Sequence, residues 1–188
     1  MAVNYRDKIL NELEEWLYSV DDKEINTFIG YLCSSDRIIC YGAGRMGLSL
    51  RPFVMRLNHF GKEAYFYGGD YTPPVNENDL YIFASASGET KSVLAIAEIA
   101  KKTKCKIVAI TGSKNSSLAK LADHVVSFKS CNGGFNAPDD VSKINSFQLM
   151  TTLNEQGTYI LYDLIIRRWF DIAQYDEKDL RSWHNNVE

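Results

Sequence analysis

The chain has 188 residues, of which 45% are hydrophobic and 24% charged, and a formal net charge of −3. This composition is typical of a globular domain and excludes a disordered chain. No basic cluster, membrane-length apolar run or signal-peptide core stands out, so we expect neither nucleic acid nor a membrane as partner. The four cysteines form no CxxC pair, which favours a reducing compartment over disulfides or zinc and predicts a cytoplasmic protein.

Two amphipathic helices are predicted at the start of the chain. Apolar residues recur at helical spacing over 9–20 and again over 25–32. Asp21-Asp22 interrupts the pattern and can cap the second helix. We expect a helical hairpin over about 3–34 that serves in packing or in contact between subunits.

Short apolar runs then alternate with helical patterns through a core of about 36–128. Because this rhythm is typical of parallel strands covered by helices on both faces, it predicts an α/β fold. We expect a three-layer α/β/α sandwich around a five-stranded parallel sheet, with ligands bound at the carboxyl ends of the strands. The predicted strands begin at Arg37, Glu63, Leu80, Lys106 and Val125.

Glycines at 42, 44 and 47 follow the first strand and precede a helix with the spacing GxGxxG. Alone, this spacing is weak evidence for a dinucleotide. The acidic ribose-binding residue is not obvious, because Glu63 stands at the start of the next strand rather than at its end. A loop that faces a phosphate or a sugar is therefore the favoured interpretation, and a nucleotide-binding protein ranks below it.

A second loop, over 85–90, joins the third strand directly to a helix. Such a junction directs backbone N–H groups and the positive end of a helix dipole to one point. Ser85, Ser87 and Thr90 add hydroxyl donors, and Gly88 permits a tight turn. The pattern predicts a phosphate site that needs neither a metal nor a lysine, and a Ser-rich helix cap is the alternative.

The remainder of the chain predicts a polar loop over 130–143, placed above the active face, and a long helix over about 152–173. A charged tail over 176–188 follows and contains His184. No linker or repeat indicates a second domain. We therefore expect one domain over 1–188, in which the long helix and the tail occupy about 146–188.

Taken together and in order, these segments resemble the sugar isomerase (SIS) domain, and the resemblance covers almost the whole chain. The tail, His184-Asn185-Asn186-Val187-Glu188, resembles the His-Ala-Asn-Leu-Glu ending of 6-phospho-3-hexuloisomerases. The resemblance implies a homotetramer, assembled as a dimer of dimers, with a phosphosugar site shared between subunits. The other segments that carry it are 42–47, 55–61, 85–90, 111–112 and 116–123.

The resemblance also implies a reaction, the interconversion of 3-hexulose 6-phosphate and fructose 6-phosphate through an enediol, with no metal or other cofactor. It places the base at Glu155, with His59 and His184 as candidates for ring opening or hydroxyl proton transfer. Glu155 also fits a capping box with Thr152, which is the structural alternative. The expected substrate-binding and phosphate-binding residues are Gly44, Arg45, Ser85, Ser87, Gly88, Glu89 and Thr90.

The chain departs from the family pattern beside these residues. Met46 and Ala86 stand where the family usually has Ser and Gly, residues 149–151 replace Pro-Met-Gly, and Asn154 replaces Phe. The added Thr151 and Asn154 predict a more polar wall. An isomerase for another sugar phosphate, or an SIS protein that binds a phosphosugar without turnover, therefore stays open as an alternative.

Overall fold

A computed structural model of the protein describes residues 4–131 and 143–184. Five parallel strands form its central sheet in the order β2-β1-β3-β4-β5. Helices connect β1 to β2, β3 to β4 and β4 to β5, as expected for parallel strands joined by crossovers. The strands are β1 (Arg37–Gly42), β2 (Glu63–Phe66), β3 (Leu80–Ala84), β4 (Lys106–Thr111) and β5 (His124–Ser127).

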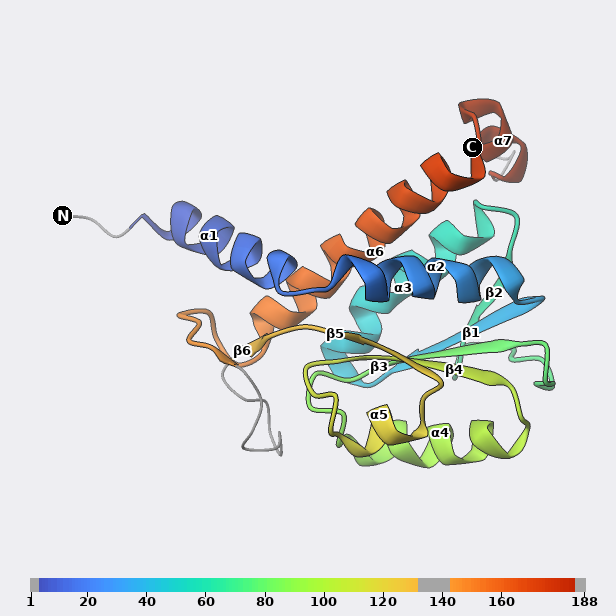
Figure 1. Ribbon diagram of the computed structural model, residues 1–188, viewed down its shortest axis with the longest axis horizontal. Helices are drawn as coiled ribbons and strands as arrows, with labels where there is room; N and C mark the ends of the chain where they lie inside the picture. The colour runs from blue at the N-terminus through green and yellow to red at the C-terminus, as the bar shows by residue number, and fades with distance from the viewer. Residues whose placement is uncertain (1–3, 132–142, 185–188) are drawn as a thin grey trace.

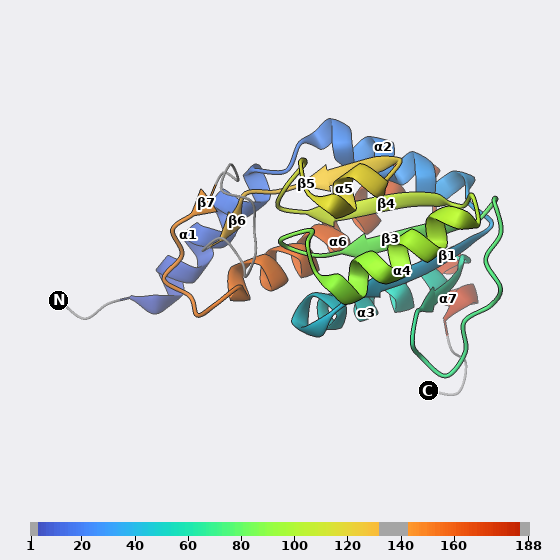
Figure 2. The same cartoon turned by 90° about the horizontal axis from the view of Figure 1, so that it is seen from below.

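Helices cover both faces of this sheet, which confirms the predicted α/β/α sandwich (Figures 1 and 2). α4 (Lys91–Lys102) and α5 (Ser117–Leu121) lie on one face. α2 (Asp22–Ser34), α3 (Gly44–Asn58) and α6 (Thr152–Ala173) lie on the other. The larger apolar core fills this second side, because α3 packs along α6, with Phe53 stacked on Tyr162 at 4.8 Å between ring centroids.

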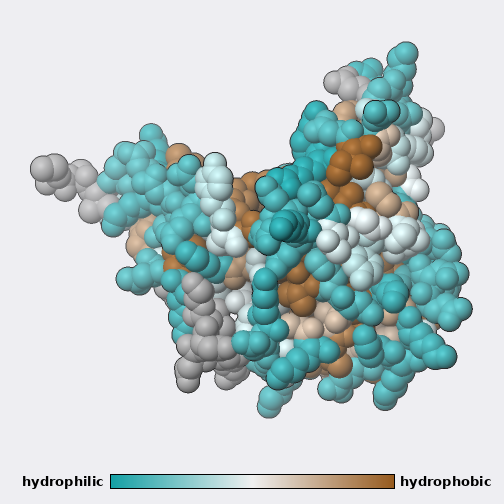
Figure 3. All heavy atoms as spheres, in the orientation of Figure 1, coloured by the Kyte–Doolittle hydropathy of each residue, from teal (hydrophilic) through white to brown (hydrophobic). Residues whose placement is uncertain are grey.

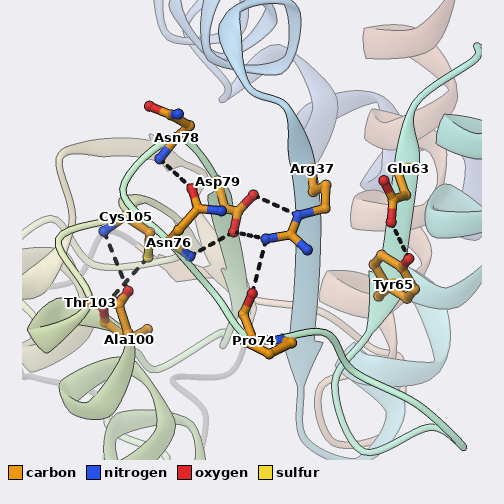
Figure 4. A network of polar contacts seen from close by, with 10 residues as sticks. All are labelled: Arg37, Glu63, Tyr65, Pro74, Asn76, Asn78, Asp79, Ala100, Thr103 and Cys105. Atoms are coloured by element: carbon orange, nitrogen blue, oxygen red, sulfur yellow. Dashed lines mark hydrogen bonds and ion pairs between the residues drawn. The ribbon is translucent and has the colours of Figure 1, made fainter.

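A loop over 67–79, rather than a helix, connects β2 to β3, and an ion pair at the amino ends of the strands fixes it (Figure 4). Both oxygens of the fully buried Asp79 accept from Arg37, at 3.0 Å from Nε and 2.8 Å from Nη2. Arg37 Nη2 also donates to the Pro74 carbonyl at 2.9 Å. A buried carboxylate needs such bidentate pairing, so this end of the sheet has a structural role.

The predicted helical hairpin is wrong, because α1 (Tyr5–Tyr18) does not fold back on α2. The two helices follow one another in the same general direction, and α1 packs against α6 (Figures 1 and 2). The fully buried Trp16 ring anchors α1. It lies so close to Gly157 of α6 that a Cβ there would be 2.3 Å from Trp16 Cδ2. The apolar face of α1 therefore packs against α6 rather than against α2.

Three short elements were not predicted: β6 (Ser130–Cys131), β7 (Lys143–Ile144) and α7 (Glu177–Trp183). β6 and β7 pair as a separate two-stranded sheet. The polar loop expected over 130–143 lies mostly outside the described residues, as do the last four residues of the tail. Within the described ranges, no helix is long and apolar enough to cross a membrane.

Candidate active site

The two glycine-containing loops lie side by side at the carboxyl end of the sheet. β1 and β3 are neighbours, and their register places Gly42 opposite Ala84, the last residue of each strand. The glycine spacing has a packing cause, since a Cβ on Gly47 would lie 2.1 Å from the Gly42 carbonyl oxygen. This close approach between strand and helix accounts for the GxGxxG pattern without a dinucleotide.

A cavity of about 170 Å³ lies between the loops. This volume is well below the roughly 300–1,000 Å³ of sites for drug-sized ligands, so it suits a small group such as a phosphate. Three of the predicted phosphate-binding residues, all with hydroxyl groups, line it. The lining residues are Ala43, Met46, Ala84, Ser85, Ala86, Ser87, Thr90 and Thr151.

Hydroxyl groups order the 85–90 loop. Ser85 Oγ accepts from the Gly88 N–H at 3.1 Å and lies 2.9 Å from Thr90 Oγ1. Ser87 Oγ accepts from the Glu89 N–H at 3.1 Å. Thr90 precedes α4 but its side chain makes no capping bond to that helix. Because Thr90 is the N-cap of α4 and lines the cavity, the positive end of this helix lies beside the cavity. The Thr90 side chain does not occupy the first N–H groups of the helix.

Two other predicted binding residues shape this loop from outside the cavity. Gly88 has φ +68°, and a Cβ there would lie 2.1 Å from Ser116 Oγ. Glu89 Oε1 accepts from the Ser117 N–H at 2.7 Å, so its carboxylate caps α5. The Glu89 carboxylate is thus bonded to α5 and does not line the cavity, where its negative charge would repel an anion. The expectation that Glu89 binds substrate therefore has no support from the direction of its side chain.

Glu155 is a buried residue, 8% exposed, and side chains hold both oxygens of its carboxylate. Oε1 accepts from Thr151 Oγ1 at 2.9 Å, and Oε2 pairs with Arg45 Nε. The residue before α6 is Thr151, and the Thr152 hydroxyl donates to the Leu149 carbonyl. The capping box of Thr152 with Glu155 is therefore wrong. Because Thr151 also lines the small cavity, Glu155 lies one hydrogen bond from it.

Arg45 and Glu155 themselves line a larger cavity, of about 480 Å³. Gly44 begins α3, which carries Arg45 in its first turn. Ala43 and Met46, on either side along the chain, line the small cavity, whereas the Arg45 side chain lines the large one. The residues around the large cavity are Leu13, Arg45, Leu48, Ser49, Glu155, Gln156, Tyr159 and Ile160.

His59 and His184 contact one another rather than Glu155. Their ring centroids lie 4.7 Å apart, and His59 is the C-cap of α3, whereas Arg45 is at its beginning. The 15-residue length of α3 corresponds to roughly 22 Å. Within one chain the two histidines are therefore separated from the cavities by the length of a helix.

Of the departures from the family pattern, Met46, Ala86 and Thr151 line the small cavity. Asn154 does not, because it is fully buried and bonded within the protein. Its Oδ1 accepts from Trp16 Nε1 and from the Cys131 N–H, and its Nδ2 donates to Ser130 Oγ. The polar wall expected from Thr151 and Asn154 thus comes from Thr151 alone.

Comparison with known proteins defines the family of this chain. Residues 31–133 match the SIS domain family, which is more than half of the chain. The chain belongs to the SIS domain family. This SIS protein is 34% identical over 189 residues to 3-hexulose-6-phosphate isomerase of Bacillus subtilis (strain 168), which covers 100% of this chain and 99% of that protein. It is 32% identical to the enzyme of the same name from Mycobacterium gastri, over 96% and 88% of the two chains.

Solved structures agree with this assignment. A protein of Methanococcus jannaschii, whose structure was described as inferring a function of 3-hexulose-6-phosphate isomerase, superposes with a TM-score of 0.79 at 29% identity. The match covers 99% of this chain and 100% of that one. The NanR protein of Vibrio vulnificus, complexed with ManNAc-6P, gives a TM-score of 0.73 at 18% identity, over 94% and 65% of the chains. This second likeness shows the fold alone.

Proposed function

We propose that the protein is a metal-independent sugar-phosphate isomerase that interconverts 3-hexulose 6-phosphate and fructose 6-phosphate. The observation that carries the proposal is the position of Glu155, a buried carboxylate one hydrogen bond from a phosphate-sized cavity. Relatives that match nearly the whole chain bear the name of this activity. An enediol isomerisation of a phosphosugar requires a base and a site for the phosphate, and Glu155 and the small cavity are suited to these two roles.

In the proposed mechanism the phosphate occupies the small cavity, where Ser85, Ser87 and Thr90 and the start of α4 receive it. Glu155 removes the proton from C2 of the 3-ketose, which leaves a 2,3-enediolate. The same carboxylate returns the proton to C3 while one proton moves from O2 to O3, and the carbonyl forms at C2. Atoms and electrons balance within the sugar, so the chemistry calls for no redox partner.

The transfer between O2 and O3 is assigned to a histidine of another subunit. His59 and His184 lie far from Glu155 of their own chain but together, so a second copy could present both. We expect a cytoplasmic homo-oligomer, a tetramer built as a dimer of dimers. Leu48 and Tyr159, 63% and 46% exposed beside Glu155, are apolar groups that a subunit contact would cover.

A second apolar surface supports assembly. A hollow of about 830 Å³ lies between α1, α2 and α6, and Figure 3 shows apolar atoms at its base. Such contiguous apolar surface usually marks an interface. Its apolar residues are Leu10, Leu13, Leu17, Val20, Ile25, Ile160, Leu161 and Leu164.

Turnover of 3-hexulose 6-phosphate to fructose 6-phosphate tests the proposal, with and without EDTA. The wild type should turn over equally in both, and Glu155→Gln should lose about 10²–10⁴-fold in kcat if it removes the base. Glu98→Gln, an exposed carboxylate of α4, is the matched control and should keep full activity. Binding of fructose 6-phosphate without any turnover would contradict the proposal.

The residues around the small cavity favour one variation on this function. Met46, Ala86 and Thr151 line it where the family usually has Ser, Gly and Gly. If the hexulose phosphate is a poor substrate, a panel of pentose, hexose and amino-sugar phosphates should reveal an isomerase for another sugar. A chain that binds members of the panel but converts none is a phosphosugar-binding protein.

A further inference from the structure

The ion pair between Arg45 and Glu155 joins a well-fixed group to a loosely held one. The Glu155 side chain is 9% exposed and is also bonded to Thr151, whereas the Arg45 side chain is 65% exposed. An ion pair with one partner in solvent contributes little to stability. Arg45 can therefore leave Glu155 at small cost, while Thr151 keeps the carboxylate in place.

A stronger partner for Arg45 would enter the neighbouring cavity. Ala43 and Met46, which flank Arg45 closely along the chain, both line the phosphate-sized cavity. A guanidinium binds a phosphate dianion through two parallel hydrogen bonds, which are stronger than one contact through Nε to a carboxylate. A change of side-chain rotamer is the movement that would carry the long arginine side chain from one cavity toward the other.

We propose that Arg45 exchanges partners in each catalytic cycle. It pairs with Glu155 in the empty site and with the substrate phosphate in the occupied site, so that phosphate binding uncovers the base. This inference rests on the proposed function insofar as a phosphate must enter the cavity beside Ser85 and Ser87. Arg45 is then both a phosphate ligand and the positioning residue that covers Glu155 between turnovers.

A double-mutant cycle on the binding of inorganic phosphate tests the exchange without turnover. The four proteins are the wild type, Arg45→Met, Glu155→Gln and the double variant, titrated by calorimetry at fixed ionic strength. Arg51→Met is the control, because it removes a positive charge from an exposed position of α3 that lines neither cavity. The control should bind phosphate like the wild type.

The exchange predicts the sign of the coupling. In the wild type, phosphate must first break the pair with Glu155, so part of the attraction of Arg45 is lost. In the Glu155→Gln background no such pair opposes the move. Arg45→Met should therefore weaken phosphate binding about tenfold in the wild type, and several-fold more than that in the Glu155→Gln background.

Any other pattern overturns the proposal. If Arg45 stays on Glu155 and only neutralises it, Arg45→Met costs phosphate affinity equally or less in the Glu155→Gln background. The proposal is also overturned if Arg45→Met leaves the phosphate affinity unchanged in both backgrounds, or if the wild type binds no phosphate. The ¹⁵N resonance of Arg45 Nε, assigned with Arg45→Lys, adds a readout in the wild-type fold, because exchange requires it to shift on phosphate addition.

Failure of the exchange and failure of the proposed function give different results. If the protein is an active isomerase but the effects of the two substitutions on phosphate affinity are additive, the proposed function stands and the exchange is refuted. If the predicted coupling is found but 3-hexulose 6-phosphate is not converted, the exchange stands and the proposed function is refuted. In an active enzyme, Arg45→Lys should recover more of the kcat lost in Arg45→Met than of the loss in KM. Lysine can move away from Glu155, but it binds phosphate through a single ammonium group.

Discussion

The indole Nε1 of Trp16 donates a hydrogen bond of 3.2 Å to Oδ1 of Asn154, 138 positions further along the chain. The same oxygen accepts from the Cys131 N–H at 2.9 Å. One buried amide thus joins α1, the small sheet and the first turn of α6. We call these hydrogen bonds of Asn154 the clamp. Because Glu155 is the next residue, the clamp also fixes the start of the helix that carries the proposed base.

Asn154→Ala is expected to destabilise the protein by about 2–5 kcal/mol, because two buried N–H donors lose their acceptor. Urea denaturation followed by tryptophan fluorescence measures this loss. Asn11→Ala, at an exposed position of α1, should change the free energy of unfolding by less than about 0.5 kcal/mol. Equal effects of the two substitutions would show that the amide network carries no stability.

Gly88 and Gly68 form a matched pair for testing whether the 85–90 loop binds phosphate, as proposed. Both have positive φ, +68° and +81°, but only Gly88 is close to another side chain, with a Cβ 2.1 Å from Ser116 Oγ. Gly88→Ala should therefore cost about 1–3 kcal/mol more than Gly68→Ala. It should also weaken phosphate binding more than about tenfold, since the loop must shift. Thermal unfolding and phosphate titration of both variants check these expectations.

Acid stability is expected to depend on Glu12. Burial opposes its ionisation, but hydrogen bonds from Ser146 Oγ, the Phe147 N–H and Gln148 Nε2 outweigh it and hold its pKa below the usual 4.5. A pKa that is lower in the folded state contributes stability above pH 4.5, which is lost as the pH falls through and below that value. Wild type should lose more free energy of unfolding between pH 6 and pH 4 than Glu12→Gln does.

Denaturant titrations at both pH values measure that difference. Glu14→Gln, an exposed position of the same helix, serves as the control and should follow the wild type. A Glu12→Gln variant with an unchanged slope between the two pH values would contradict the assignment.

A shared active site predicts complementation between two inactive variants. Glu155→Gln and His184→Ala remove residues that lie near opposite ends of α3, since Glu155 pairs with Arg45 at its start and His184 contacts His59 at its end. Co-expressed subunits that mix at random should regenerate about a quarter of the sites with both residues intact, provided that each site uses two subunits. Activity of the purified mixed oligomers is compared with that of the separate variants. Activity no higher than their sum would place the whole site in one chain.

Local patterns predicted most of the sheet. The apolar runs that begin at Arg37, Glu63, Leu80 and Lys106 are strands, and the long helix has the predicted ends, Thr152 and Ala173. These elements follow from short-range periodicity and from Gly or Ser at their ends. Four residues of the 85–90 loop line the cavity, because this short loop joins the end of β3 directly to the start of α4; they are Ser85, Ala86, Ser87 and Thr90.

What the sequence did not predict depends on partners far along the chain. Arg45 and Glu155 are 110 positions apart, and neither neighbourhood indicates the pair. The direction of α1 depends on Trp16 meeting Gly157, a glycine that looks like a weak point in a helix until its neighbour is known. α7 does have a local signal, the capping box of Asp176 and Asp179. The segment is nevertheless typical of a charged tail, because most of its residues are charged or polar.

α1 has a single fully buried side chain. Trp16 is its one buried residue, since Leu13 and Leu17 pack only partly against the core and Glu12 is held at the surface by the 146–148 segment. Such a segment detaches at a lower free energy than the sheet unfolds, so its amide hydrogens should exchange well before those of β1 and β3. Each detachment also releases the clamp beside the proposed base. Warming should therefore reduce catalysis at temperatures where the sheet is still intact.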